Sequence, residues 1–192
     1  MSERVWAGHA RLADYLPVLE LIASSYPATW LSISELHEEA GAPEDAKDAL
    51  MRYLEKPGGS PEQSRAWEQL TKLCRETGDS LGEVHALIEI SQLADTSLNR
   101  MSAAANRFNS LLSSGELRLD TAEKQVMAKK LATAMEGRIA DGDATDCSRL
   151  AWLFLHLHDE TGARKYAETG LSLDWDNRYC RGLMESLDQQ SS

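Results

Sequence analysis

The sequence predicts an all-α protein, an α-solenoid built from antiparallel helical hairpins with about ten helices. Its 192 residues suffice for one domain or one elongated helical array. Good helix formers dominate the composition and β-branched residues are scarce, which favours helix. No segment of four to eight residues alternates apolar and polar with period two, so we expect no sheet. Apolar residues instead recur three and four positions apart within short segments separated by turn signals.

The turn signals divide the chain into helix-sized pieces. We expect helices over residues 8–25, 27–40, 43–55, 61–77, 80–94, 97–113, 120–140, 145–158, 160–173 and 176–188. Helices of this length are marginal alone and must pack on each other. Loops of two to five residues make neighbouring helices run antiparallel. The expected result is a row of helical hairpins.

Each break between these helices has a chemical cause. Pro27 and Pro43 suit the first turn of the helices that they begin. The run "KPGGSP" at 56–61 is the strongest break, because two adjacent glycines are too costly to order in a helix. Gly78 follows the last turn of one helix, and Asp79 or Ser80 caps the next.

Matching positions recur along the chain. Trp30 and Trp67 lie 37 residues apart, and Gly41 and Gly78 are separated by the same 37 residues. Each glycine closes the helix that holds its tryptophan. Such a shared offset indicates one helical unit of about 34–40 residues, used about four times.

The last unit, "LAWLFLHLHDETGARKYAETGLSLDWDN", resembles a tetratricopeptide repeat (TPR). Ala151, Phe154 and Ala163 occupy the small, aromatic and small positions of that motif, and Trp175 stands where a proline usually ends the unit. The units of Trp30 and Trp67 resemble it too, although the second has Glu83 where a small residue belongs. A shift of one residue, to Val84, would restore an apolar residue there.

The resemblance implies a single TPR-like domain over residues 1–192. Its expected parts are an N-terminal capping helix at 8–25, two repeat hairpins at 27–94, a divergent hairpin at 97–140, a repeat hairpin at 145–173 and a C-terminal capping helix at 176–188. Small residues let the two helices of each hairpin approach closely. Ala46 and Ala163 are therefore expected to be buried.

Charge and cysteine content restrict the class of protein. The formal net charge is −11 and no basic run stands out, which disfavours nucleic-acid binding. Three cysteines without a C-x-x-C pair favour a reducing compartment. Neither a signal-peptide pattern nor an apolar run of membrane-spanning length is present in the sequence. We expect a cytoplasmic, acidic protein without membrane contact.

No motif predicts catalysis, a metal or a cofactor. His156 and His158 are two residues apart, about 200° around a helix, so they cannot share one metal ion. His37 is better explained as a half-buried packing residue than as a base. The sequence also has no nucleophile elbow, no phosphate-binding glycine loop and no H-E-x-x-H motif. We therefore expect no enzymatic activity, with a helical enzyme of unrecognised site as a remote alternative.

The resemblance implies that the first helix of each hairpin lines a concave face. The partner-binding residues carried over from it are Leu31, Glu35, Glu38, Glu39, Arg65, Glu68, Lys72, Arg75, Ser148, Trp152, Leu155 and His156. The glutamates would favour a basic segment, and Trp152 with Leu155 would anchor an apolar side chain. The alternative for Trp152 is packing under the helix at 97–113.

The expected function is protein–protein interaction, as a scaffold or adaptor that holds a peptide or helix. The alternative is a sensor or oligomerisation domain of a larger multidomain protein of bacterial type. Either apolar end of the array could then form a contact in a homo-oligomer.

Overall fold

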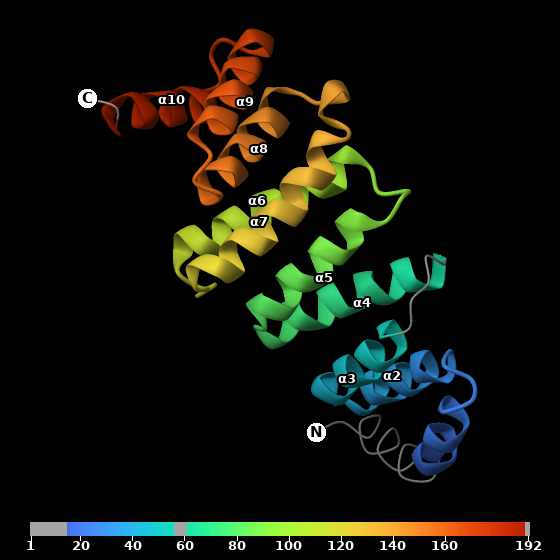
Figure 1. Ribbon diagram of the computed structural model, residues 1–192. Coiled ribbons are helices and arrows are strands. Elements are labelled where there is room, and N and C mark those ends of the chain that lie inside the picture. Colours follow the sequence, from blue (N-terminus) through green and yellow to red (C-terminus); the bar gives the residue numbers. More distant parts are fainter. Residues whose placement is uncertain (1–14, 56–60, 191–192) are drawn as a thin grey trace. The chain divides into compact units, whose positions relative to one another are not determined.

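The computed structural model describes residues 15–55 and 61–190. A helix over residues 15–23 comes first. The remaining elements are α2 (Thr29–Ala40), α3 (Pro43–Leu54), α4 (Pro61–Thr77), α5 (Ser80–Gln92), α6 (Leu98–Ser114), α7 (Thr121–Glu136), a 3₁₀ turn (Ile139–Asp141), α8 (Ala144–His156), α9 (Glu160–Leu173) and α10 (Arg178–Gln190). No strand occurs in this part of the chain, so the predicted all-α class is confirmed (Figure 1).

The chain divides into two compact units, Met1–Ala86 and Leu87–Ser192, with the boundary inside α5. In the first unit α3 packs between α2 and α4. In the second, α8 contacts α6, α7, α9 and α10. Consecutive helices in each unit therefore pack side by side, as expected for an α-solenoid. The single domain over 1–192 stays a prediction.

Most helix boundaries fall within two residues of those expected, and α9 matches 160–173. The end of α7 differs most from the prediction, and the end of α8 differs by two residues. The helix expected over 120–140 ends at Glu136, where Gly137 follows and a 3₁₀ turn takes over. The helix expected over 145–158 ends at His156, and His158 adopts a left-handed conformation with φ 57°. Residues 8–14 and the "KPGGS" break lie outside the described residues.

A left-handed residue closes the first helix of each of four hairpins. These residues are Gly41 (φ 75°), Gly78 (φ 75°), Gly115 (φ 76°) and His158 (φ 57°). The backbone N–H after three of them donates to the carbonyl five residues earlier, as Ala42 does to His37 at 2.8 Å, Asp79 to Cys74 at 2.8 Å and Asp159 to Phe154 at 3.0 Å. This is the Schellman arrangement, which satisfies carbonyls left open at the end of a helix.

The same turns bring the two helices of a hairpin into close contact. Asp79 caps α5 by accepting from the Gly82 N–H at 2.9 Å, and Asp159 caps α9 by accepting from Gly162 at 2.8 Å. A Cβ on Gly82 would lie 2.8 Å from the Cys74 sulfur, and one on Gly162 would lie 2.4 Å from the Phe154 ring. Glycine is therefore required for the helices to cross at this distance.

Ala46 and Ala163 lie at the same place in their hairpins, five residues after the left-handed residue. Both are 0 % exposed, which confirms the sequence prediction. Glu83 occupies the corresponding position in the α4–α5 hairpin and is 1 % exposed. Arg75 donates to its carboxylate from Nη2 at 2.7 Å and from Nε at 2.9 Å. An ion pair therefore occupies the place that alanine fills elsewhere.

The described residues of the first unit form two hydrophobic clusters. One joins α3, α4 and α5 through Ala46, Leu50, Ala66, Leu70, Leu73, Cys74 and Ala86. The other consists of Ala23, Ile33 and Ala49, from the helix at 15–23, α2 and α3. Lys47 ties α3 to the α4–α5 turn, since its ammonium lies 3.3 Å from Asp79 and 2.7 Å from Glu44. Burial lowers the pKa of Lys47, but the two carboxylates outweigh it and raise the pKa overall.

The second unit is held by α8, which is buried along one whole side. Leu150, Ala151 and Leu153 are all 0 % exposed. At Gly170 of α9 an added Cβ would lie 2.5 Å from the Cys180 sulfur of α10 and 3.2 Å from the Ala144 carbonyl of α8. This close approach fixes α10 against α8 and α9, and α8 also contacts α6.

His158 is the one described non-glycine residue with positive φ, so its replacement by glycine should stabilise the fold. A Cβ in the left-handed region costs about 1–2 kcal/mol, partly offset by the entropy that glycine loses on folding. We expect His158→Gly to raise the unfolding free energy by about 0.5–1 kcal/mol in urea titration. His85→Gly, in the middle of α5, is the matched control and should cost about 1 kcal/mol. If both variants raised the unfolding free energy, or both lowered it, the left-handed conformation of His158 would be contradicted.

Candidate functional site

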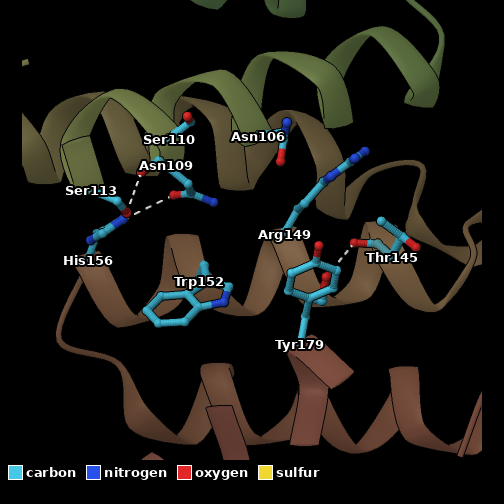
Figure 2. A pocket seen from close by; sticks show the side chains of 10 residues that line it. Asn106, Asn109, Ser110, Ser113, Thr145, Arg149, Trp152, His156 and Tyr179 are labelled. Atoms are coloured by element: carbon cyan, nitrogen blue, oxygen red, sulfur yellow. Dashed lines mark hydrogen bonds between the residues drawn. The ribbon is translucent and has the colours of Figure 1, made fainter. Parts of the chain in front are cut away.

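A groove in the second unit runs between α6 and α8, with α10 contributing at one end. It has a volume of about 240 Å³ and is lined by Asn106, Asn109, Ser110, Ser113, Thr145, Ser148, Arg149, Trp152, His156 and Tyr179. Figure 2 shows the side chains of α6 on one side and those of Trp152 and Tyr179 on the other. Nine of its ten lining side chains carry no formal charge when histidine is neutral.

Trp152 is the largest apolar side chain of the groove. It is 39 % exposed, whereas its neighbours Ala151 and Leu153 are fully buried in the core. Successive side chains of an α-helix point about 100° apart. Trp152 therefore faces the groove, while Ala151 and Leu153 face the interior. Tyr179 of α10 is 49 % exposed, and the Arg178 guanidinium lies 4.6 Å from its ring centre. The groove thus presents two aromatic side chains to solvent.

His156 holds the Asn109 amide in place. The two side chains are joined by a hydrogen bond of 3.0 Å between Nε2 and Oδ1 (Figure 2). The Phe108 ring packs edge-on against the imidazole, with 5.7 Å between the ring centres. Burial, with repulsion from Lys124 and His158, lowers the pKa of His156 to about 4. The imidazole is therefore neutral near pH 7. Because the amide oxygen only accepts, Nε2–H donates, and the Asn109 NH₂ group keeps its donors for other partners.

Arg149 is the one formally charged side chain of the lining and is already anchored. Its Nη1 donates to the Ser102 hydroxyl at 2.7 Å and lies 4.0 Å from Asp146. Asp146 in turn completes the capping box of α8 with Asp143. These contacts fix the guanidinium at the groove, and the Asp146 carboxylate partly balances its charge.

The structure brings three of the predicted last-repeat residues into this groove. Ser148, Trp152 and His156 all line it. Ser148 is buried and donates its hydroxyl to the Thr145 carbonyl at 2.7 Å. Leu155, the expected second apolar anchor, is half-buried and is not part of the lining. Trp152 therefore lines the groove without Leu155.

The predicted residues of the first unit form a network of their own. Leu31 packs against the core cluster rather than facing solvent. Glu38 accepts from the Gln69 amide and lies 3.7 Å from Lys72. Lys72 also lies 3.9 Å from Glu76, and Arg75 is held by the buried Glu83. Glu35, Glu39, Arg65 and Glu68 are exposed on α2 and α4.

Seven lining residues lie outside the twelve partner-binding residues predicted from the sequence. Four of them are Asn106, Asn109, Ser110 and Ser113 on α6; Thr145, Arg149 and Tyr179 are the others. The missing signal was Gly115, which lies 37 residues after Gly78, as Gly78 does after Gly41. With this offset of 37 residues, Asn106 corresponds to Gln69 and Asn109 corresponds to Lys72. The offset would have assigned α6 the same role as α4 despite its divergent sequence.

Metal binding and membrane insertion find no support in the described residues. No group of three or more histidine, cysteine, aspartate or glutamate side chains there is placed to hold a metal ion. Among the helices of the same residues, none combines the length and hydrophobicity of a transmembrane span. All three cysteines are unpaired and buried.

Comparisons with known proteins leave the family open. No protein-family model matches the chain, and no curated protein matches it in sequence. The functional argument therefore depends on the groove itself.

The partly buried His156 predicts a specific pH dependence of stability. Its folded pKa of about 4 lies below the ordinary 6.5, so the unfolded chain binds the extra proton first. The neutral His156 costs no stability above about pH 6.5, but the unfolding free energy falls as the pH drops toward 4, because the unfolded chain takes up a proton there. We expect His156→Gln, which can still donate to Asn109, to reduce the loss of unfolding free energy between about pH 7 and pH 4.5 by about 1–3 kcal/mol.

Urea titrations at the two pH values measure this difference. His85→Gln, at an exposed position of α5, serves as the control and should leave the pH dependence as it is in the parent protein. An unchanged pH dependence in His156→Gln would contradict a partly buried imidazole that stays neutral.

Proposed function

We propose that the chain is a protein–protein interaction module that binds a peptide segment or helix in the groove of its second unit. The observation that carries the proposal is the 39 % exposed Trp152 in a groove lined mainly by uncharged polar side chains. An aromatic anchor surrounded by hydrogen-bonding groups is typical of sites that dominate the binding energy of protein interfaces. The proposal assigns the chain no reaction of its own.

The chemistry of the groove favours a polypeptide as ligand. Trp152 and Tyr179 offer apolar area to one side chain of the partner. The Asn109 amide and the hydroxyls of Ser110 and Ser113 can pair with backbone N–H and C=O groups, which every peptide segment carries. Each of these groups is uncharged, so the partner does not need to be basic at this groove.

The groove is also organised before it binds. The bond from His156 fixes Asn109, and the bond to Ser102 fixes Arg149. Side chains already held in one rotamer lose little entropy when a partner binds. This supports a binding surface rather than a face that merely contacts water.

We also propose that the chain is a divergent TPR-like repeat protein of the cytoplasm. Four hairpins close on a left-handed residue, and Ala46, Glu83 and Ala163 follow that residue at one fixed distance. Such equivalence between hairpins supports a repeated unit. Three cysteines that are buried and unpaired fit a reducing compartment.

The test uses Trp152→Ala and its matched control Trp175→Ala. Trp175 is 78 % exposed and lies outside the groove lining. Peptides selected from a displayed random library on the parent protein are measured by calorimetry against both variants. We expect Trp152→Ala to weaken binding about ten-fold or more, as for an anchor residue, and Trp175→Ala to leave it unchanged.

Thermal unfolding of both variants separates binding from folding. Because Trp152 is partly exposed, its removal should cost less than the roughly 3–5 kcal/mol of a fully buried aromatic side chain. Selected peptides that bind Trp152→Ala as tightly as the parent protein would overturn the groove as the binding site. A loss of stability at the buried-aromatic level would instead support packing as the role of Trp152.

A further inference from the structure

A second cavity lies in the first unit, away from the residues of the groove. It has a volume of about 150 Å³ and is lined by Leu16, Glu20, Trp30, Ile33, His37, Asp45, Asp48, Ala49 and Arg52. Its walls come from the helix at 15–23 and from α2 and α3. Three carboxylates and one guanidinium line it, so the cavity has an excess of negative charge.

His37 contributes a buried polar atom without a hydrogen bond. The residue is 8 % exposed, and its Nδ1 has no hydrogen-bond partner among the residues that the structure describes. Oδ2 of Asp45 lies 3.9 Å from Nδ1, too far for a direct hydrogen bond. A buried polar group left unpaired costs free energy, so such an atom indicates a missing partner.

A donor placed between these two atoms would satisfy both. A nitrogen at ordinary hydrogen-bond distance from Nδ1 also reaches the Asp45 carboxylate, because the two acceptors are 3.9 Å apart. The same nitrogen would be attracted by the further carboxylates of Glu20 and Asp48. This arrangement favours a cation with several N–H groups over a neutral molecule.

Arg52 decides which kind of cation fits. Its guanidinium lies 4.7 Å from the Trp30 ring centre, so the ring already stacks on a planar cation of the chain itself. A second guanidinium would need another flat surface. An ammonium is compact, donates three hydrogen bonds and needs no stacking surface. The apolar side chains of Leu16, Ile33 and Ala49 can contact the alkyl chain that carries it.

We propose that this cavity binds a primary ammonium group on an alkyl chain, with His37 Nδ1 and the Asp45 carboxylate as hydrogen-bond acceptors. Free alkylamines and lysine side chains share this chemistry. The site is independent of the groove in the second unit, so either proposal can fail without the other.

The test measures binding of n-butylammonium to the full chain by NMR chemical-shift titration, with Nα-acetyl-lysine methylamide as a second probe. n-Butanol, which has nearly the same shape and no charge, is the control ligand. We expect butylammonium to shift the amide signals around His37 and Asp48 in a saturable way, and butanol to leave them unshifted. Binding of both amines would indicate that lysine side chains are accepted, whereas binding of butylammonium alone would assign the site to free amines.

The variant Asp45→Asn/Asp48→Asn removes two carboxylates at exposed positions and should weaken butylammonium binding about ten-fold or more. Glu39→Gln/Glu55→Gln makes the same charge change in the same unit, outside the cavity, and should bind as the parent protein does. His37→Gln should also weaken binding, provided that its circular dichroism spectrum matches that of the parent. Equal binding of butanol, equal weakening in both double variants, or no saturable shift would overturn the proposal.

Discussion

The close crossing of two helices behind a left-handed turn is the constraint on which the rest of the structure depends. At Gly41, Gly78, Gly115 and His158 the chain reverses within a few residues, and the helices that follow pack back on those before. Where the crossing is tightest, at Gly82 and Gly162, even a Cβ would collide with the partner helix. A residue larger than glycine at these two points would force the helices or the side chains that face them to move.

The groove is a consequence of the same packing. Helix α8 contacts α6, α7, α9 and α10, and Trp152 stays partly uncovered in the groove that α6 and α10 line with it. The polar groups around it are arranged by the same helices, since the hydrogen bond between His156 and Asn109 joins α8 to α6. The packing of the hairpins therefore determines where the groove forms.

The sequence allowed the helices and their small-residue contacts to be predicted because both follow local rules. Ala46 and Ala163 could be placed in the core because they occupy the small-residue positions of the repeat motif that the sequence resembles. The role of α6 could not, because its apolar pattern diverges and only Gly115 keeps the register. Nor could the sequence show that Leu31 packs inward, that Arg75 pairs with a buried Glu83, or that His37 Nδ1 lacks a partner. Those facts depend on contacts between residues distant in the chain.

The measurement that tests the central claim most directly is the unfolding free energy of Gly78→Ala and Gly115→Ala compared with Gly182→Ala. A Cβ at any of these three positions meets no atom within 4 Å, so backbone conformation alone separates them. The left-handed turns predict a loss of about 1 kcal/mol at Gly78 and Gly115. At Gly182, inside α10, alanine should instead add about 0.5–1 kcal/mol. A gain in stability at all three positions would contradict the account.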